Sequence, residues 1–214
     1  TGGDKTASIT TGALTVGATG STSLINLVIR ANGGAINPGA IGTSLIALPG
    51  SVLIDNTNAG AIGAGNLSTA AVAGVALTID GAIYANKAIT ISGVSNGNTA
   101  VNQSAVINSA GNTSQTGTVT ITGTTNTGSG VVATALISGK VLTITGTANG
   151  TGVATSLGAL TLWGGGGDLT VVGNNANQSG TGISQSGNIT DNVVGGNITF
   201  RSNNNINQTG TITM

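Results

Sequence analysis

Few residues in this 214-residue chain could carry out chemistry. There is no His, Cys or Glu, which excludes Ser-His-Asp and Cys-His nucleophilic catalysis and most zinc sites. Glycoside hydrolysis needs only two carboxylates about 5–10 Å apart. Asp55 and Asp80 each follow an isoleucine and are separated by the length of one repeat, so they could stack. Asp80 could equally be a turn residue before Gly81. We favour structural roles for both and predict no catalytic residue and no enzymatic activity.

The segment WGGGGDLTVVG, residues 163–173, resembles a glycine-rich calcium-binding nonapeptide only in part. When the two are aligned on Asp168, Trp163 replaces the first glycine and Thr170 replaces the apolar residue, and there is one copy. A phosphate-binding loop would need Lys and Ser or Thr after the glycines. We interpret the segment as a turn between two strands. We expect the Trp163 side chain to lie over the surface of the solenoid, and the alternative is that this side chain contacts sugar. We predict no metal-binding or cofactor-binding residue.

Composition excludes several classes of partner. Only 5% of the residues are charged, the net charge is zero, and the charges are scattered along the chain. Nucleic acids and anionic membranes both attract clustered basic residues, so we expect neither as a partner. No run of about 18 apolar residues could form a membrane-spanning helix. The start of the chain lacks the pattern of a signal peptide, so an export signal would have been removed or would lie outside this stretch.

A short phrase with apolar residues at every second position recurs along the chain, often closed by Gly or Asn. This period and the abundance of Val, Ile and Thr are typical of β-strands. The distance along the sequence from one phrase to the next runs from about 9 to 30 residues. Several of these distances are near 25 residues, the length of one coil of a β-solenoid. Residues 59–77 come closest to a helix, but their glycines disfavour one. The phrases are ALTVG (13–17), LVIRANG (27–33), SVLIDN (51–56), ALTIDG (76–81), AITISG (88–93), TVTITG (118–123), VLTITG (141–146), ALTLWG (159–164), DLTVVG (168–173), NITFRS (197–202) and TITM (211–214).

A second motif places a glycine two residues after a glutamine, in four of the five glutamines. We predict that it forms corners between strands, because Gly adopts left-handed turn conformations at no steric cost. Gln and Asn side chains stacked in successive coils could also form amide ladders. The predicted corner residues are Gln115 and Gly117, Gln178 and Gly180, Gln185 and Gly187, and Gln208 and Gly210.

Pairs of threonines spaced two residues apart lie on the expected outward sides of 118–122, 143–145 and 211–213. Such pairs are typical of flat ice-binding faces, which require a regular ladder in every coil. Other phrases place Ser92, Asp80, Trp163 or Arg201 in this position. The sequence therefore favours ordinary outward-facing threonines.

The LTITG, ITISG, GNIT and QTGTIT phrases resemble the passenger repeats of bacterial filamentous haemagglutinin-like and autotransporter-type adhesins, best over residues 76–214. The Asn-Pro-Asn-Gly signature of that family's secretion domain is represented only by Asn37-Pro38-Gly39, so we do not assign that domain. The resemblance implies a right-handed parallel β-helix, export to the bacterial cell surface, and a role as stalk, adhesin or matrix fibre.

Together these features predict an all-β chain, a right-handed parallel β-helix with irregular coils of roughly 20–30 residues. We expect one solenoid segment over 1–214, less regular in 1–75 than in 76–214. Neither end shows a cap, so we expect a longer chain or end-to-end stacking of molecules. The predicted function is a non-enzymatic, secreted structural protein that associates with itself, end to end or laterally, or with surface glycans or cells. The alternatives are a self-assembling filament subunit and a polysaccharide-binding or polysaccharide-cleaving β-helix.

Overall fold

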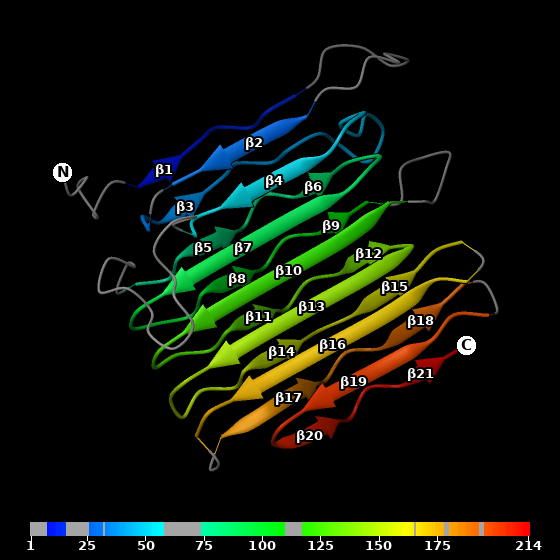
Figure 1. Ribbon diagram of the computed structural model, residues 1–214. Coiled ribbons are helices and arrows are strands. Elements are labelled where there is room, and N and C mark those ends of the chain that lie inside the picture. Colours follow the sequence, from blue (N-terminus) through cyan, green and yellow to red (C-terminus); the bar gives the residue numbers. More distant parts are fainter. Residues whose placement is uncertain are drawn as a thin grey trace.

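A computed structural model of the chain shows a parallel β-solenoid of about six turns (Figure 1). The structure describes residues 8–15, 26–31, 33–57, 74–109, 117–164, 166–177, 180–192 and 195–214. These residues form three parallel sheets and contain no helix. The predicted fold class is therefore confirmed. Residues 58–73, which include most of the segment closest to a helical pattern, lie outside the described part of the chain.

We call the three sheets A, B and C. From β5 onward each coil contributes one strand to each sheet in turn, and in the first two coils isolated bridges at Leu14, Ile41 and Leu48 take the place of strands of sheet B. Sheet A contains β1 (Ile9–Thr10), β3 (Ile36–Asn37), β5 (Leu77–Ile79), β8 (Val101–Gln103), β11 (Val131–Ala133), β14 (Thr155–Leu157), β17 (Thr181–Gln185) and β20 (Asn205–Gln208). Sheet B contains β6 (Ile83–Tyr84), β9 (Ile107–Asn108), β12 (Ile137–Gly139), β15 (Leu160–Leu162), β18 (Ile189–Asp191) and β21 (Ile212–Thr213). Sheet C contains β2 (Leu27–Arg30), β4 (Val52–Asp55), β7 (Ile89–Ser95), β10 (Thr118–Thr125), β13 (Val141–Ala148), β16 (Asp168–Asn175) and β19 (Ile198–Ser202).

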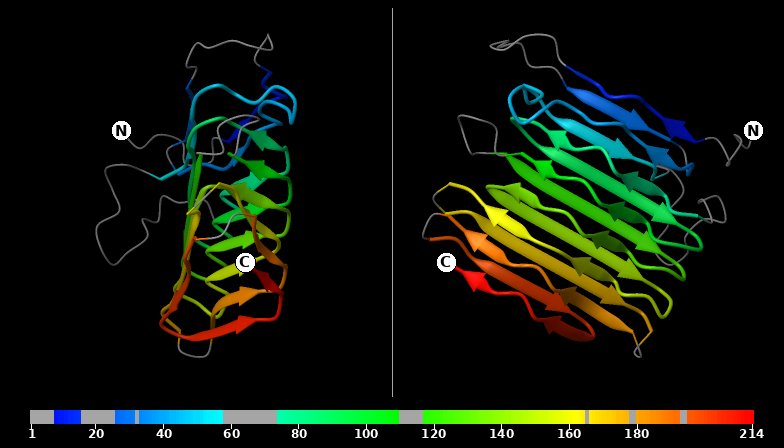
Figure 2. Two further views of the ribbon diagram at one scale, coloured as in Figure 1. Left: turned by 90° about the vertical axis from the view of Figure 1, so that its right-hand side faces the viewer. Right: turned by 180° about the vertical axis from the view of Figure 1, so that it is seen from behind.

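Sheet C forms one wall of the solenoid, and sheets A and B together form the opposite wall. In Figure 1 the strands of sheet C lie in front and run to the left, while those of sheets A and B lie behind and run to the right. The chain descends from the N-terminal to the C-terminal coil as it winds, so the solenoid is right-handed. Figure 2 shows both walls from the side and from behind.

The register of sheet C shows how the length of the coils varies. Ile121 pairs with Ile144, so the length of the coil between them falls within the predicted range of roughly 20–30 residues. Ile54 pairs with Ile91, and the coil between these two residues exceeds that range because it includes residues 58–73. The shortest steps noted in the sequence lie within single coils, because Ile79 belongs to sheet A and Leu162 to sheet B.

The core is a thin layer of aliphatic side chains between the two walls. Burial alternates along β13, where Leu142 and Ile144 are fully buried and Thr143 and Thr145 are half-buried. The same alternation holds in β10. Each fully buried Val, Leu or Ile contributes about 1.5–3 kcal/mol relative to an exposed one. The inward and outward directions predicted from the period of two are confirmed in these strands.

Four of the glycines that close the repeated phrases lie inside strands of sheet C and not after them. Each occupies an inward position where the beginning of a sheet A strand approaches the wall closely. A Cβ atom at Gly93 would lie 2.5 Å from the Ala100 carbonyl oxygen, and one at Gly146 would overlap the Ala154 carbonyl oxygen. The aligned glycines are Gly93, Gly123, Gly146 and Gly173.

Candidate functional site

The two aspartates considered for glycoside hydrolysis lie in different sheets. Asp55 ends β4 in sheet C, where its register partners are Arg30 and Ser92. Asp80 follows β5 in sheet A, and the side-chain nitrogen of Asn37, in its favourable orientation, donates to the Asp80 carboxylate over 2.9 Å. The prediction that the two carboxylates could stack is therefore wrong, because the coil that begins at Asp55 extends beyond Asp80 to Ser92 before it returns to the same position.

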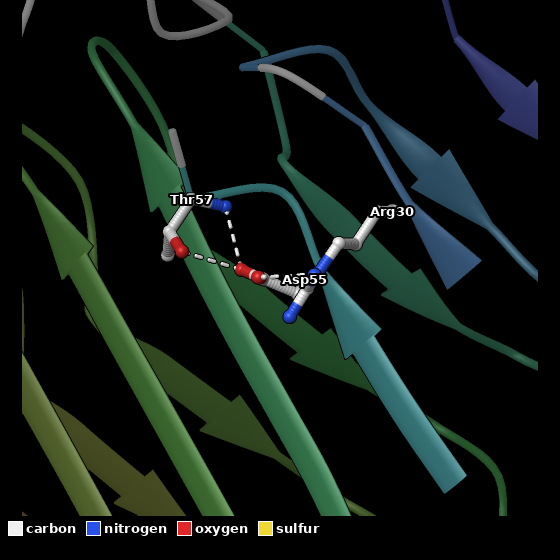
Figure 3. A network of polar contacts seen from close by, with 3 residues as sticks. All are labelled: Arg30, Asp55 and Thr57. Atoms are coloured by element: carbon white, nitrogen blue, oxygen red, sulfur yellow. Dashed lines mark hydrogen bonds and ion pairs between the residues drawn. The ribbon is translucent and has the colours of Figure 1, made fainter. Parts of the chain in front are cut away.

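Asp55 forms a polar network with residues of its own and the preceding coil (Figure 3). Its Oδ2 atom lies 3.3 Å from Nε of Arg30. Its Oδ1 atom accepts hydrogen bonds from the backbone nitrogen of Thr57 over 2.8 Å and from the Thr57 hydroxyl. The Asp55 side chain is 10% exposed. Both carboxylate oxygens thus have partners within the protein, and the contact with Arg30 connects two successive coils.

The glycine-rich segment between β15 and β16 is a turn, as predicted. Gly164 and Gly166 have φ values of 85° and 72°, a conformation that favours glycine. Asp168 accepts hydrogen bonds of 3.1 Å from both the backbone and the side-chain nitrogen of Asn197 in the next coil. Trp163 is half-buried, and its backbone nitrogen donates to the Gly139 carbonyl. Within the described ranges, no group of three His, Cys, Asp or Glu residues could hold a metal ion.

Where the structure describes the whole motif, at Gln185 and Gln208, it lies at the junction of sheets A and B, as a predicted corner should. Gly117 instead lies between sheets B and C, and Gly180 between sheets C and A. Gln185 ends β17, and its side-chain nitrogen donates to the carbonyl oxygens of Gly187, over 2.8 Å, and Gly158, over 2.9 Å. Gln208 ends β20 and donates in the same way to Gly210. Gln115 and Gln178 lie outside the described residues, whereas Gly117 and Gly180 lie within them.

The reason for glycine at these corners differs from the predicted one. Neither Gly187 nor Gly210 has a positive φ, so left-handed turn geometry is not what requires glycine. A Cβ atom at Gly210 would instead overlap the Gly187 carbonyl group of the preceding coil. Cβ atoms at Gly117 and Gly180 would overlap neighbouring residues as well. Gly187 and Gly210 therefore allow successive corners to stack closely, whereas the groups nearest to Gly117 and Gly180, at Ser109 and Asn175, belong to the same coil.

Among the described residues, asparagines and not glutamines form the amide ladder between coils. The side-chain nitrogen of Asn126 donates to the side-chain oxygen of Asn96 over 2.6 Å, and that of Asn149 donates to Asn126 over 3.2 Å. Gln185 and Gln208 are register neighbours, but their amide nitrogens donate to backbone carbonyls. The amides of Gln185 and Gln208 thus stabilise their own corners, and that of Gln185 also binds the preceding coil at Gly158, whereas the asparagine amides bind one another across coils.

The outward side of sheet C carries an ordered array of hydroxylated side chains. One register column consists entirely of threonine over five strands, β7 to β19, and the next begins with Ser92, Thr122 and Thr145 before Val172 and Arg201. Asp80 and Trp163, which broke the threonine pattern in the sequence, do not lie in sheet C. The pure threonine column is Thr90, Thr120, Thr143, Thr170 and Thr199.

This threonine face is a regular surface feature that the sequence alone did not reveal. Its side chains are half-buried along the strands, as expected for outward residues packed against their register neighbours. The signal was present in the phrases TVTITG and VLTITG, but only the register separates them from phrases such as ALTIDG and ALTLWG, which belong to other sheets.

No helix in the described part of the chain is long and apolar enough to cross a membrane. Comparison of the chain with protein-family models, curated proteins and solved structures gives no match. The function is therefore argued from the geometry of the solenoid.

Proposed function

We propose that this chain is a non-enzymatic structural segment, a rigid β-solenoid in a secreted stalk, adhesin or matrix fibre at a bacterial cell surface. The observation that supports this most directly is the continuity of the three parallel ladders along the axis. Sheets A, C and B have eight, seven and six strands, so each coil hydrogen-bonds to the next on both walls. A solenoid with continuous ladders can transmit force along its axis and hold its first and last coils at a fixed separation.

Side chains at the junction of sheets C and A add connections between coils. Ser95 donates from its hydroxyl to the Gly74 carbonyl over 2.7 Å, and the Thr125 hydroxyl donates to the Asn98 carbonyl. In the same place on a later coil, the Asn175 amide donates to the Gly152 carbonyl. Partly buried hydrogen bonds of this kind contribute about 0.5–1.5 kcal/mol each. They involve no charge, so the connections are insensitive to salt.

The strands of the last described coil offer a surface for association. β20 and β21 are largely exposed, with Ile206 45% and Ile212 40% exposed. Unpaired strand edges are templates for pairing with another strand. A further coil of the same spacing would pair with them, whether it belongs to the same polypeptide or to a neighbouring molecule. This geometry also supports the alternative of a filament subunit.

The polysaccharide alternative receives less support from the geometry. Carbohydrate-binding surfaces use clustered aromatic rings as flat contacts. Tyr84 points outward from sheet B, Phe200 packs against the core from sheet C, and Trp163 lies near the junction of sheets B and C. Tyr84 and Trp163 are separated by several coils, so they do not form one platform.

The experiment that tests the structural role is single-molecule stretching of the chain between its two ends. A load-bearing solenoid should resist force and then release coils in successive steps of about 20–30 residues. Extension without measurable force steps would contradict the proposal. The intact mass of the polypeptide from its source then separates the two forms of the role. A mass far above 20.3 kDa indicates a segment of a longer fibre, and a mass near it indicates a stacking subunit.

A further inference from the structure

We propose that the outward threonine face of sheet C binds ice. The face is defined by the all-threonine column, Thr90 to Thr199, together with the adjacent Ser92, Thr122 and Thr145 and the outer Thr124 and Thr147. The ligand is the surface of solid water, and this activity would be additional to the structural role.

The first support is the two-dimensional regularity of the face. Neighbouring strands of a sheet lie about 4.8 Å apart, and residues two apart along a strand lie about 6.6 Å apart. β10 and β13 pair over eight consecutive residues without a shift, and so do β13 and β16. Thr120, Thr122, Thr143 and Thr145 therefore form a rectangle of hydroxyl groups, and Thr90 with Ser92 continues it by one coil. In β16 and β19 the all-threonine column continues beside Val172 and Arg201. The oxygen atoms of an ice surface repeat in two dimensions on the same length scale.

The second support is the chemistry of threonine. Its hydroxyl group both donates and accepts hydrogen bonds, as a water molecule does. Its β-branch restricts χ1, so the hydroxyl and methyl groups of neighbours in a packed column hold fixed positions. Ordered water bridging such hydroxyls costs little entropy because the side chains are already ordered. An array of this kind can hold a layer of water that continues into a crystal.

The third support is the rigidity of the wall beneath the face. The inward neighbours Ile121, Leu142 and Ile144 are fully buried. Gly123 and Gly146 bring the backbone of sheet A directly against the same strands, without space for side-chain motion. Binding of a rigid lattice requires a surface that is already in its bound arrangement, because ordering it at the time of binding would reduce the affinity.

The lack of charged and aromatic side chains in the threonine column argues against other ligands at this face. The column from Thr90 to Thr199 contains no charged and no aromatic residue, which disfavours nucleic acid, anionic lipid and stacked sugar. Asp168 and Arg201 lie at its margins. The remaining competitor is a second copy of this chain packed face to face, and the test separates it from ice.

The test measures thermal hysteresis and the shape of growing ice crystals with the purified chain. The substitution Thr143→Lys places a long charged side chain in the middle of the face. The matched control is Thr161→Lys, at a half-buried outward threonine of β15 in sheet B. We expect hysteresis and faceted crystals with the unsubstituted chain and with the control, and loss of both with Thr143→Lys. Circular dichroism checks that each variant is folded. If the Thr143→Lys variant is not folded, the Thr143→Ser variant, which lacks one methyl group, replaces it in the test. We expect the thermal hysteresis of the Thr143→Ser variant to be reduced.

Two results would overturn the inference. One is the absence of any effect of the unsubstituted chain on ice growth, and the other is undiminished activity of the folded variant at Thr143. Sedimentation velocity then tests the competing occupant. Self-association that Thr143→Lys abolishes, without an effect on ice, would identify the face as an interface between copies.

Discussion

The side-chain amide of Asn126 donates a hydrogen bond of 2.6 Å to the side-chain oxygen of Asn96, which lies one coil earlier and 30 residues away in the sequence. Asn149 extends this contact to a third coil. The three residues lie at the end of sheet C, where the chain turns toward sheet A. Coils of a solenoid are thus connected by side chains at the corners as well as by the backbone ladders.

Replacement of Asn126 by alanine should remove both hydrogen bonds of this ladder. We expect a decrease in the free energy of unfolding of about 1–2 kcal/mol, because each bond contributes about 0.5–1.5 kcal/mol and water can replace part of it. Chemical denaturation followed by circular dichroism measures the change. Asn174→Ala is the control, since among the described residues its exposed side chain has no hydrogen-bond partner. An equal effect of both substitutions would show that the ladder does not contribute.

Replacement of Gly146 by alanine should be among the most damaging single changes in the chain. Its Cβ atom would overlap the Ala154 carbonyl oxygen, and both groups belong to tightly packed backbone. Overpacking of a tight core costs about 1–3 kcal/mol and more where only backbone can move. The expected result is a loss of at least that magnitude, or failure to fold, in a thermal melt. Gly12→Ala, where no atom lies within 4 Å of the added Cβ, should leave the melting temperature unchanged.

Gln185→Leu tests the corner motif. The substitution removes the donor to the Gly158 and Gly187 carbonyls, and each buried acceptor left without a partner costs about 1–3 kcal/mol. The loss is partly offset because Oε1 of Gln185 is itself buried without a partner among the described residues. We expect a net destabilisation of about 1–3 kcal/mol by urea denaturation. Gln208→Leu, in a more exposed corner, should cost less; the reverse order would contradict the assigned role.

The Arg30–Asp55 ion pair should contribute little by itself. The Arg30 side chain is 64% exposed, and exposed ion pairs contribute about 0–1 kcal/mol. Arg30→Ala should therefore change the free energy of unfolding by less than about 1 kcal/mol. Asp55→Ala should cost more, about 1–2 kcal/mol, because it also removes both bonds to Thr57. Denaturation at low and high salt checks this, and a strong salt dependence of the Asp55→Ala effect would show that charge, and not hydrogen bonding, dominates.

Stability should hardly depend on pH in the neutral range. The chain has no His, and His is the side chain that ordinarily changes its charge between about pH 5 and 8. We expect melting temperatures at pH 5.5 and 7.5 to differ by less than about 2 °C, which corresponds to about 0.5–1 kcal/mol at most for a domain of this size. A larger difference would reveal a titrating group coupled to folding.

Local sequence was sufficient to predict strands and their buried sides. In VLTITG, Leu142 and Ile144 face the core and Thr143 and Thr145 face outward, as the period of two requires. The recurrence of such phrases also predicted a β-solenoid, and the resemblance to adhesin passenger repeats implied its right-handed parallel form. The phrases do not reveal which wall they join: ALTLWG and VLTITG have the same alternation, yet Leu160–Leu162 lies in sheet B and Val141–Ala148 in sheet C.

The sequence by itself determined the element type, the thin aliphatic core and the scarcity of charged chemistry, because these depend on residue type and on a two-residue period. Tertiary structure alone decided the register. It separated Asp55 from Asp80, placed Gly146 against Ala154, and aligned Thr90 with Thr199 through the intervening strands. Alternation encodes only the inward or outward direction of a side chain. The position of a residue along the axis depends on the number of residues in every coil and loop before it, which is fixed by non-local strand pairing.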